Sequence, residues 1–217
     1  KANGVPLAKI ASRIMSGEKL AKYKLKYQTN KKFAVKEAVF PFNKFPDSDV
    51  LLGPEMKSTG EVMGFDDDFG MAYAKSQIAA SNSLPTKGLA FLSVKDSHKE
   101  EIIDLAKKLL KLNFNLCGTN GTANAIREKG IKCKKINKVS GGTPHIVDVL
   151  NSKRIALVIN TGGGKRRHRL SDARALRRAT LINKVPYCTN MSTAYACLEA
   201  IQSLKNKKLK VKSLQEN

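Results

Sequence analysis

A short turn rich in glycine and threonine carries the clearest chemical signal in the sequence. Residues 118–122 read Gly-Thr-Asn-Gly-Thr and lie between an apolar run and the start of a predicted helix. Backbone N–H groups at such a turn, together with the hydroxyls of Thr119 and Thr122, suit a bound phosphate. The turn has neither the Gly-Lys-Ser/Thr of a Walker loop nor a Gly-x-Gly-x-x-Gly dinucleotide fingerprint. On its own it is more typical of a tight turn than of an anion site.

Further groups suited to an anion follow other predicted strands. They are Ser93 and Lys99 after one strand, Lys138 in a glycine-rich stretch, and Asn160 and Thr161 at the end of another strand. Lysine ammonium groups form charge-assisted hydrogen bonds to anions, which are stronger than neutral ones. If these groups meet the Gly-Thr-Asn-Gly-Thr turn at one edge of a sheet, we expect an anion-binding site there.

Groups able to transfer protons are scarce at this edge. The candidates for a general base are His145, Asp148 and His168. His145 fits equally a helix cap and the rim of the ligand site, whereas His168 lies among basic residues and fits a solvated loop. No residue resembles a nucleophile with its base. We therefore expect the site to hold an anion without transforming it, and we assign no catalytic residue.

Alternating strand and helix patterns after residue 88 must bring these groups together. Strands are predicted over 89–94, 114–119, 131–137, 154–160 and 185–189, and helices over 96–113, 121–130, 144–153, 172–184 and 192–208. This alternation is typical of a parallel sheet with helices on both faces. Ligands in such sheets bind beyond the carboxyl ends of the strands, where the groups above fall.

The first part of the sequence has a different pattern. We predict a helix over 5–26 that is broken at Gly17, a strand over 33–45, turns over 47–64 and a helix over 66–81. The stretch 81–88 contains Ser, Asn, Pro and Gly without an apolar period, and we place the domain linker there. The predicted domains are residues 1–82 and residues 83–217.

The net charge of +22 raises the question of nucleic acid. Aromatic residues make up only 6% of the chain, there is no Trp, and no pattern resembles a stacking platform for single strands. The basic end, 205–217, is more typical of a solvated terminus than of a binding arm. No apolar run approaches the roughly 20 residues of a membrane helix. We expect neither nucleic acid nor a membrane as partner, whereas small anions fit the charge.

The four cysteines, Cys117, Cys133, Cys188 and Cys197, form no Cys-x-x-Cys pair and have no histidine at zinc spacing. We expect free, mostly buried thiols in a reducing cytosol, and hence a cytoplasmic protein without a metal site. The sequence begins Lys-Ala-Asn-Gly-Val-Pro, without an initiator Met or the apolar core of a signal peptide. We therefore expect that it starts inside a longer chain.

Several long segments resemble one enzyme family. The segments "PFNKFP" (41–46) and "LLGPEMKSTGEVMG" (51–64) resemble the carboxy-terminal part of the carbamoyl phosphate synthase large chain. Residues 2–20 are similar to the end of its second ATP-grasp module, and residues 89–217 to its regulatory domain. The resemblance implies an α/β fold: a parallel-sheet, methylglyoxal-synthase-like (Rossmann-like) domain behind a small α+β remnant of an ATP-grasp module.

The resemblance also implies an activity for the full protein. That family makes carbamoyl phosphate from bicarbonate, ATP and ammonia supplied by a glutaminase small chain, for pyrimidine and arginine synthesis. Its cofactors would be ATP with Mg²⁺ (or Mn²⁺) and K⁺, held by residues that precede Lys1. We therefore expect this chain alone to be inactive and without a cofactor. The implied partners are the small chain, the rest of the large chain and further copies of the protein.

The family's effector residues can be carried over position by position. A nucleotide effector site, for UMP or IMP, would consist of Ser93, Lys99, Thr119, Asn120, Gly121, Thr122, Lys138, Asn160 and Thr161. An ornithine activator site would consist of Glu37, Phe40, Leu52, Tyr187 and Thr189. The Glu37 carboxylate would pair with the ornithine ammonium. Without the resemblance, Glu37 is more typical of a surface strand carboxylate.

Two departures from the family pattern bear on function. Gly162 stands where many relatives carry a second Thr after the Asn-Thr pair, in a loop that is lengthened here. Thr143 stands where methylglyoxal synthases carry their Asp base, which argues against lyase activity. Two alternatives stay open: a free-standing methylglyoxal-synthase-type lyase, which needs a carboxylate base, and a basic nucleic-acid-binding module, which would bind with a steep salt dependence.

Overall fold

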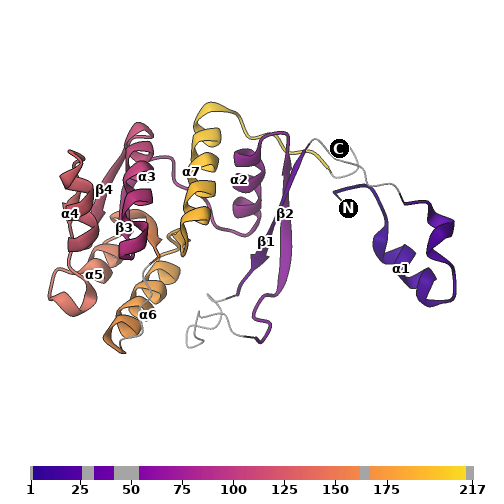
Figure 1. The fold of residues 1–217 in the computed structure, drawn as a ribbon, viewed down its shortest axis with the longest axis horizontal. Helices are drawn as coiled ribbons and strands as arrows, with labels where there is room; N and C mark the ends of the chain where they lie inside the picture. Colours follow the sequence, from indigo (N-terminus) through magenta and orange to yellow (C-terminus); the bar gives the residue numbers. More distant parts are fainter. Residues whose placement is uncertain (1, 26–31, 42–53, 162–166, 214–217) are drawn as a thin grey trace.

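The structure is a computed structural model that describes residues 2–25, 32–41, 54–161 and 167–213 (Figure 1). The described strands are β1 (Phe33–Val39), β2 (Gly60–Asp66), β3 (Gly88–Ser93), β4 (Phe114–Gly118), β5 (Lys134–Lys135), β6 (Ile155–Asn160) and β7 (Tyr187–Cys188). The described α-helices are α1 (Leu7–Met15), α2 (Phe69–Ala79), α3 (Lys99–Lys111), α4 (Asn120–Glu128), α5 (Ile146–Asn151), α6 (Arg167–Ile182) and α7 (Met191–Asn206). Short 3₁₀ helices are η1 (Leu20–Tyr23), η3 (Asp96–His98) and η4 (Val139–Gly141).

A five-stranded sheet in the order β5-β4-β3-β6-β7 forms the centre of the larger part of the chain. Every neighbouring pair in it is parallel. Helices α3, α4 and α7 pack on one face and α5 and α6 on the other, in two separate clusters of buried apolar side chains. The predicted α/β class, with helices on both faces of a parallel sheet, is therefore confirmed.

The central strand β3 is buried on both faces. Ala90 and Leu92 pack into one cluster and Phe91 into the other, and none is more than 1% exposed. A strand covered on both sides has a continuous apolar sequence, as "LAFL" has here. The register pairs the end of β3 with the end of β6, Ser93 opposite Asn160. Polar residues from two strands thus meet at one edge.

Helix α3 follows from its amphipathic pattern. Its fully buried side chains recur three or four residues apart: Ile102, Leu105, Ala106 and Leu109. Glu100 and Glu101 lie in its first turn and Lys111 in its last, where the helix dipole favours their charges. The predicted helix over 96–113 is confirmed, with η3 forming its first turn.

A two-stranded antiparallel sheet, β1–β2, precedes the parallel sheet. The predicted strand over 33–45 is confirmed for β1. The predicted turns over 47–64 are wrong for the residues from Gly60 onward, which belong to β2. A glycine at position 64 suggests a turn, but this glycine lies within β2. Position 64 requires glycine because a Cβ there would collide with the carbonyl oxygen of Ala72 in α2.

Helix α2 lies between this small sheet and α7 (Figure 1). At Gly70 an added Cβ would lie 2.6 Å from the Glu199 carbonyl oxygen, so the two helices touch backbone to backbone. Asp68 caps α2 by accepting a hydrogen bond of 2.8 Å from the Met71 N–H. It also accepts from Ser203 Oγ at 2.6 Å and from Lys207 Nζ at 2.8 Å, both at the end of α7. These bonds lower the pKa of Asp68 to about 2.

The N-terminal segment forms α1 and η1, which lie apart from both sheets (Figure 1). Between them Gly17 has a φ of 102°, a conformation that glycine adopts without strain. The predicted break of the helix at Gly17 is confirmed. Leu7 and Met15 are 61% and 89% exposed, so α1 presents apolar side chains to its surroundings.

The strands at the two edges of the parallel sheet are short. Strands β5 and β7 have two residues each, whereas longer strands are predicted over 131–137 and 185–189. The predicted helix over 172–184 starts earlier, at Arg167. The predicted linker, 81–88, joins α2 to β3, and the division at residue 82 stays a prediction. No described helix combines the length and apolar character needed to cross a membrane.

Candidate functional site

A cavity of about 280 Å³ lies at the carboxyl ends of β3, β4 and β6. Its volume is near the lower end of the range for small-molecule pockets. Its walls include seven residues of the predicted nucleotide set: Ser93, Lys99, Thr119, Gly121, Thr122, Lys138 and Asn160. The structure therefore brings together most of the groups that the sequence places after separate strands. That they bind a nucleotide stays a prediction.

The turn after β4 is held tightly against β3. The Thr119 N–H donates to the Leu92 carbonyl at 3.3 Å. At Gly118 an added Cβ would lie 2.6 Å from the same carbonyl oxygen, so this position requires glycine. Thr119 is the residue before α4, and its own side chain does not cap the helix. Its hydroxyl is therefore directed to the cavity wall and not to the helix backbone.

Three hydroxyl groups form a buried cluster in this wall. Thr119 Oγ1 donates to Ser93 Oγ at 3.3 Å and contacts Thr122 Oγ1 at 3.4 Å. Thr122 Oγ1 in turn accepts a hydrogen bond of 3.1 Å from the Val94 N–H. Thr119 and Thr122 are only 6% and 1% exposed. Because packing orients these hydroxyls in advance, an anion that binds them need not order them.

Lysine ammonium groups stand beside the hydroxyl cluster. Lys99 Nζ lies 3.9 Å from the position that a Cβ would occupy at Gly121, over the first turn of α4. It pairs with Asp96 at 2.8 Å, but the Asp96 side chain is 94% exposed, and such pairs are weak. Lys138 lines the same cavity from the segment before η4. Ammonium groups and a helix N-terminus together favour a negatively charged ligand.

The other two residues of the predicted nucleotide set lie outside the cavity wall. Asn120 is the exposed first residue of α4. The Thr161 N–H donates to the Ser93 carbonyl at 3.1 Å, and Thr161 Oγ1 lies 3.0 Å from Nδ1 of His98. His98 was not among the residues predicted from the sequence. It precedes α3 and holds the Thr161 hydroxyl next to the cavity.

A carboxylate, Asp172, also lines the cavity from α6. It accepts a hydrogen bond of 2.7 Å from Ser140 Oγ. It is not among the candidates for a general base that the sequence suggests, His145, Asp148 and His168. Nothing local in the sequence indicates that Asp172 belongs to the site, because only the packing of α6 places it at the cavity. A half-buried carboxylate of this kind accepts hydrogen bonds from ligand hydroxyls.

The candidate bases named from the sequence lie elsewhere. His145 and Asp148 cap α5 reciprocally: Asp148 N–H donates to His145 Nδ1 at 3.4 Å, and His145 N–H donates to Asp148 Oδ2 at 2.9 Å. His145 is thus a helix cap and not part of the cavity wall. Thr143 is exposed and does not line the cavity either. The side chain of His168 lies outside the described part of the chain, as does Gly162.

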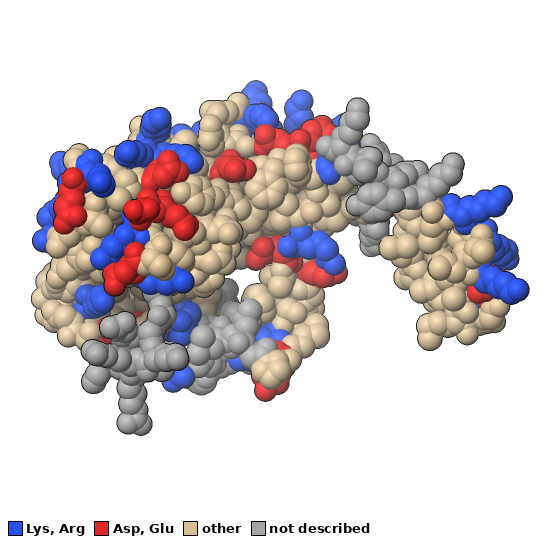
Figure 2. Space-filling view, in the orientation of Figure 1, with Lys and Arg blue, Asp and Glu red and all other residues tan. Residues whose placement is uncertain are grey.

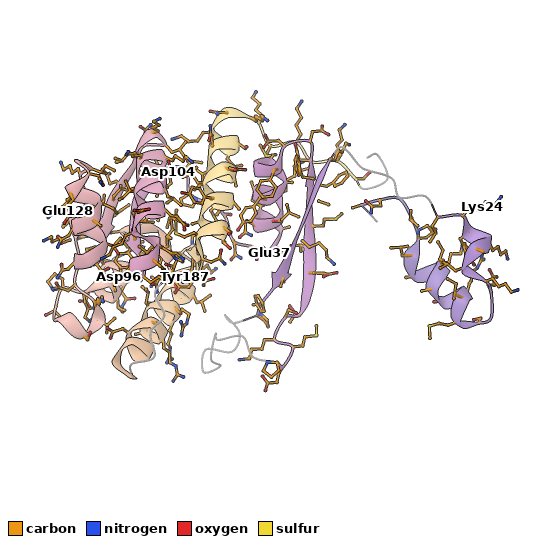
Figure 3. All side chains as sticks on the ribbon, viewed as in Figure 1. Lys24, Glu37, Asp96, Asp104, Glu128 and Tyr187 are labelled. Carbon is orange, nitrogen blue, oxygen red and sulfur yellow. The ribbon has the colours of Figure 1, made fainter. Side chains whose placement is uncertain are left out.

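The predicted ornithine residues fall on two strands. Glu37 and Phe40 lie on or just after β1, and Tyr187 and Thr189 on or just after β7; Leu52 lies outside the described residues. Glu37 points from β1 toward α7 (Figure 3). Burial raises the pKa of Glu37, although a hydrogen bond with Gln77 partly opposes this. Thr189 is exposed.

Tyr187 connects the two predicted sites. Its hydroxyl accepts a hydrogen bond of 3.0 Å from Nδ2 of Asn160, which lines the cavity. Burial raises the pKa of Tyr187, so the phenol remains neutral at ordinary pH. Tyr187 and Asp96 lie at the same end of the parallel sheet (Figure 3). The strand β7 thus carries a predicted ornithine residue into contact with a predicted nucleotide residue.

A second, wider hollow of about 1410 Å³ lies beside β2, α2 and residues 207–212. Its described lining combines Asp66, Asp67 and Asp68 with several lysines. None of the predicted effector residues is among them. Opposite charges there pair with one another, as Lys75 does with Asp66 at 2.7 Å. The smaller cavity is therefore the better candidate for a specific anion.

Comparison with known proteins gives the family context. A model of the MGS-like domain matches residues 101–189. The whole chain is 48% identical to the carbamoyl phosphate synthase large chains of Mesorhizobium japonicum and Methanobrevibacter smithii, of which it covers 19% and 20%. It is 45% identical to the protein of Aquifex aeolicus named carbamoyl phosphate synthase large chain, C-terminal section, of which it covers 44%. The chain thus spans about a fifth of the full-length relatives.

Among solved structures, the methylglyoxal synthase of Elizabethkingia anophelis is similar to part of the chain. The alignment has a TM-score of 0.45 and 23% sequence identity. It covers 53% of this chain and 79% of that one.

Proposed function

We propose that this chain is the regulatory part of a carbamoyl phosphate synthase large chain, because its whole length is similar to the C-terminal section of such enzymes. In this proposal the cavity binds a nucleoside monophosphate, UMP or IMP. Glu37, Phe40, Leu52, Tyr187 and Thr189 bind ornithine. The two effectors together control carbamoyl phosphate synthesis for the pyrimidine and arginine pathways.

The chemistry itself belongs to the rest of the large chain in this proposal. There, ATP with Mg²⁺ or Mn²⁺ and K⁺ would serve a ligase that takes ammonia from a glutaminase small chain in the cytoplasm. Among the described residues, no group of three or more His, Cys, Asp and Glu side chains is placed to hold a metal ion. The cavity has the hydroxyls and ammonium groups of an anion site, so we assign it a regulatory ligand.

The single observation that supports the nucleotide is the convergence of the hydroxyl cluster with Lys99 and Lys138 around one cavity. A phosphate accepts hydrogen bonds, which the hydroxyls can donate, and carries negative charge, which the lysine ammonium groups can balance. Apolar side chains in the same wall, Phe91, Val139 and Ile146, suit a planar base. Asp172, which lines the cavity and accepts a hydrogen bond from Ser140, suits ribose hydroxyls.

A ligand in this cavity acts at a distance from the proposed ligase chemistry. It therefore works only if it favours one arrangement of the chain over another. Coupling free energies between such sites are typically about 1–3 kcal/mol. We propose that UMP lowers, and ornithine raises, the use of ATP by the intact enzyme through such a coupling.

Calorimetric titration of the chain with UMP, IMP and ornithine tests the proposal. Thr119→Ala and Lys138→Ala should each weaken nucleotide binding, by about fivefold to a hundredfold, because each removes a partner of the phosphate. Lys135→Ala, an exposed lysine on β5 outside the cavity, is the matched control and should leave binding unchanged. Unchanged binding in both cavity variants would show that the site is assigned wrongly.

Two alternatives are separated by simple assays. Asp172 supplies a carboxylate beside the cavity, so a lyase of the methylglyoxal synthase type would release inorganic phosphate from dihydroxyacetone phosphate, and Asp172→Asn would abolish that release. A nucleic-acid-binding module would bind duplex DNA or RNA with a steep loss of affinity between low and moderate salt. Lysine and arginine side chains are spread over the visible face, with acidic ones among them (Figure 2), which favours neither outcome.

A further inference from the structure

Two buried cysteines face each other where β7 meets α7. Cys188 ends β7 and Cys197 lies in α7, and their Sγ atoms are 3.4 Å apart. They are 1% and 3% exposed, and both are free thiols. Cys197 Sγ also lies 3.6 Å from the Tyr73 hydroxyl of α2. A disulfide has an S–S length of about 2.05 Å, so its formation would need a closure of only about 1.3 Å.

The other two cysteines are arranged differently. Cys117 Sγ donates to the Ala90 carbonyl at 3.5 Å, and Cys133 Sγ donates to the Lys134 carbonyl at 3.9 Å. Burial raises the pKa of Cys117 to about 12 and that of Cys133 to about 11. Both therefore remain thiols, which are poor nucleophiles.

The contact between the facing thiols gives them different roles. The contact with the Cys188 thiol, and then the contact with the Tyr73 hydroxyl, lower the pKa of Cys197, and burial opposes them. The same contact, together with burial, raises the pKa of Cys188. Cys197 is therefore the better nucleophile of the pair, and the 3.4 Å contact places Cys188 beside the sulfur with which it would form a disulfide.

We propose that Cys188 and Cys197 form a reversible disulfide, a modification site for a two-electron oxidant of the hydroperoxide class. The Cys197 thiolate attacks one oxygen of hydrogen peroxide; the O–O bond breaks, Cys197 becomes a sulfenic acid and hydroxide leaves, to be protonated to water. The Cys188 sulfur then attacks the sulfenic sulfur, an S–S bond forms, the S–O bond breaks, and the hydroxide that leaves takes the Cys188 proton to form a second water. Two thiols are oxidised and one peroxide is reduced.

The burial of both sulfurs selects the reagent. A small neutral peroxide reaches them through local opening of the β7–α7 contact, whereas a bulky charged disulfide does not. The new bond would tie β7, which carries Tyr187, to α7, which packs on α2. This inference does not depend on the proposed effectors.

Peptide mass spectrometry of the full 217-residue chain tests the proposal. Lys184 and Lys205 flank a stretch without other Lys or Arg, so trypsin releases both sulfurs in one peptide, residues 185–205. The chain is treated with hydrogen peroxide, denatured, alkylated and digested. This peptide should then carry no alkyl group and weigh two hydrogens less than the reduced peptide. Treatment with dithiothreitol before alkylation should restore both alkylation sites. The peptides with Cys117 and Cys133 should lose alkylation at least about tenfold more slowly.

Cys188→Ala separates the two steps. In this variant Cys197 should still form a sulfenic acid, which dimedone traps, and no loss of two hydrogens should occur. The wild-type measurement stands alone if that variant does not fold. Oxidation of all four cysteines at similar rates, or addition of oxygen to Cys188 or Cys197 without loss of two hydrogens, would overturn the proposal; Met191 in the same peptide can also gain an oxygen, so fragmentation must locate it.

Discussion

The side-chain amide of Asn160 donates a hydrogen bond of 3.0 Å to the hydroxyl of Tyr187. Asn160 belongs to the wall of the cavity at the strand ends, and Tyr187 belongs to the predicted ornithine set. One hydrogen bond therefore joins the proposed site of the nucleotide to the proposed site of the activator.

Tyr187→Phe removes this hydrogen bond and keeps the ring. We expect nucleotide affinity to fall by about fivefold, the value of a typical single hydrogen bond, although Tyr187 does not line the cavity. Calorimetry with UMP measures the change. Tyr195→Phe is the matched control, because the Tyr195 hydroxyl bonds to Asp104 on α3. An equal effect in both variants would mean that the Asn160 contact is not the cause.

His98→Ala should weaken nucleotide binding by about threefold to tenfold, because it frees the Thr161 hydroxyl that His98 holds at 3.0 Å. His98→Asn keeps a hydrogen-bonding side chain and should retain most of the affinity. Titration calorimetry distinguishes the two variants. If the Asn variant were as weak as the Ala variant, the imidazole would have a role other than the orientation of Thr161.

Asp68→Ala should lower the free energy of unfolding at neutral pH by about 1–2 kcal/mol, because it removes the cap of α2 and its bonds to α7. The pKa of Asp68 is lowered to about 2 in the folded chain, below its ordinary value of 3.8. The stabilisation is therefore present above about pH 4 and is lost as the pH falls toward 2.

Urea unfolding of the wild type and of Asp68→Ala at pH 7 and near pH 2.5 measures this difference. The exposed neighbour supplies the control, since Asp67→Ala should change little at either pH. A difference between wild type and Asp68→Ala that stayed constant down to pH 2.5 would contradict the lowered pKa.

Glu37→Gln should weaken ornithine binding by about tenfold or more, because it removes the carboxylate proposed to pair with the ammonium. Burial raises the pKa of Glu37 above its value in the unfolded chain, so the protonated form is favoured by folding. Its contribution to stability is therefore lost as the pH rises through the folded pKa, and Glu37→Gln should be more stable than the wild type at neutral pH.

Ornithine titrations at pH values below and above the pKa of Glu37 in the folded chain provide a second measurement for this residue. Wild-type affinity should rise as the pH rises through the folded pKa and Glu37 ionises, and the Gln variant should lack this rise. Glu61→Gln, an exposed glutamate on β2, serves as the control. Identical pH profiles for wild type and Glu37→Gln would exclude Glu37 from the ornithine site.

Gly70→Ala should destabilise the chain by about 1–3 kcal/mol, because the new methyl group would meet the Glu199 carbonyl at 2.6 Å and force α2 away from α7. Gly60→Ala is the control, since an added Cβ there has no neighbour within 4 Å. Thermal and urea unfolding compare the two. Equal stability of the two variants would show that α2 and α7 separate easily.

Local chemistry explains what could be predicted from the sequence. The hydroxyls of Thr119 and Thr122 were predicted because their turn has a composition suited to phosphate, and strand–helix alternation placed that turn at the correct edge of a parallel sheet. Asp172 and His98 were missed, because only the packing of α6 brings Asp172 to the cavity and only the turn before α3 brings His98 to the Thr161 hydroxyl.

Tertiary contacts explain the remaining differences. In the sequence Gly64 suggests a turn, but it lies in strand β2. Glycine is needed there because α2 approaches the strand too closely to leave room for a side chain. From the sequence, His145 could cap a helix or contact a ligand. Only its reciprocal hydrogen bonds with Asp148 in the structure show that it caps α5. The order β5-β4-β3-β6-β7 is likewise absent from any local pattern, since it depends on which crossovers pass over which face.

The two-residue strands at the margins of the parallel sheet have a consequence for self-association. A short margin offers few unpaired N–H and C=O groups to another molecule, and β5 consists of two lysines that repel a second copy of themselves. Continuation of the sheet from one molecule into the next is therefore disfavoured. A homo-oligomer of this protein would therefore use surfaces other than these two margins, such as α1, where Leu7 and Met15 are exposed.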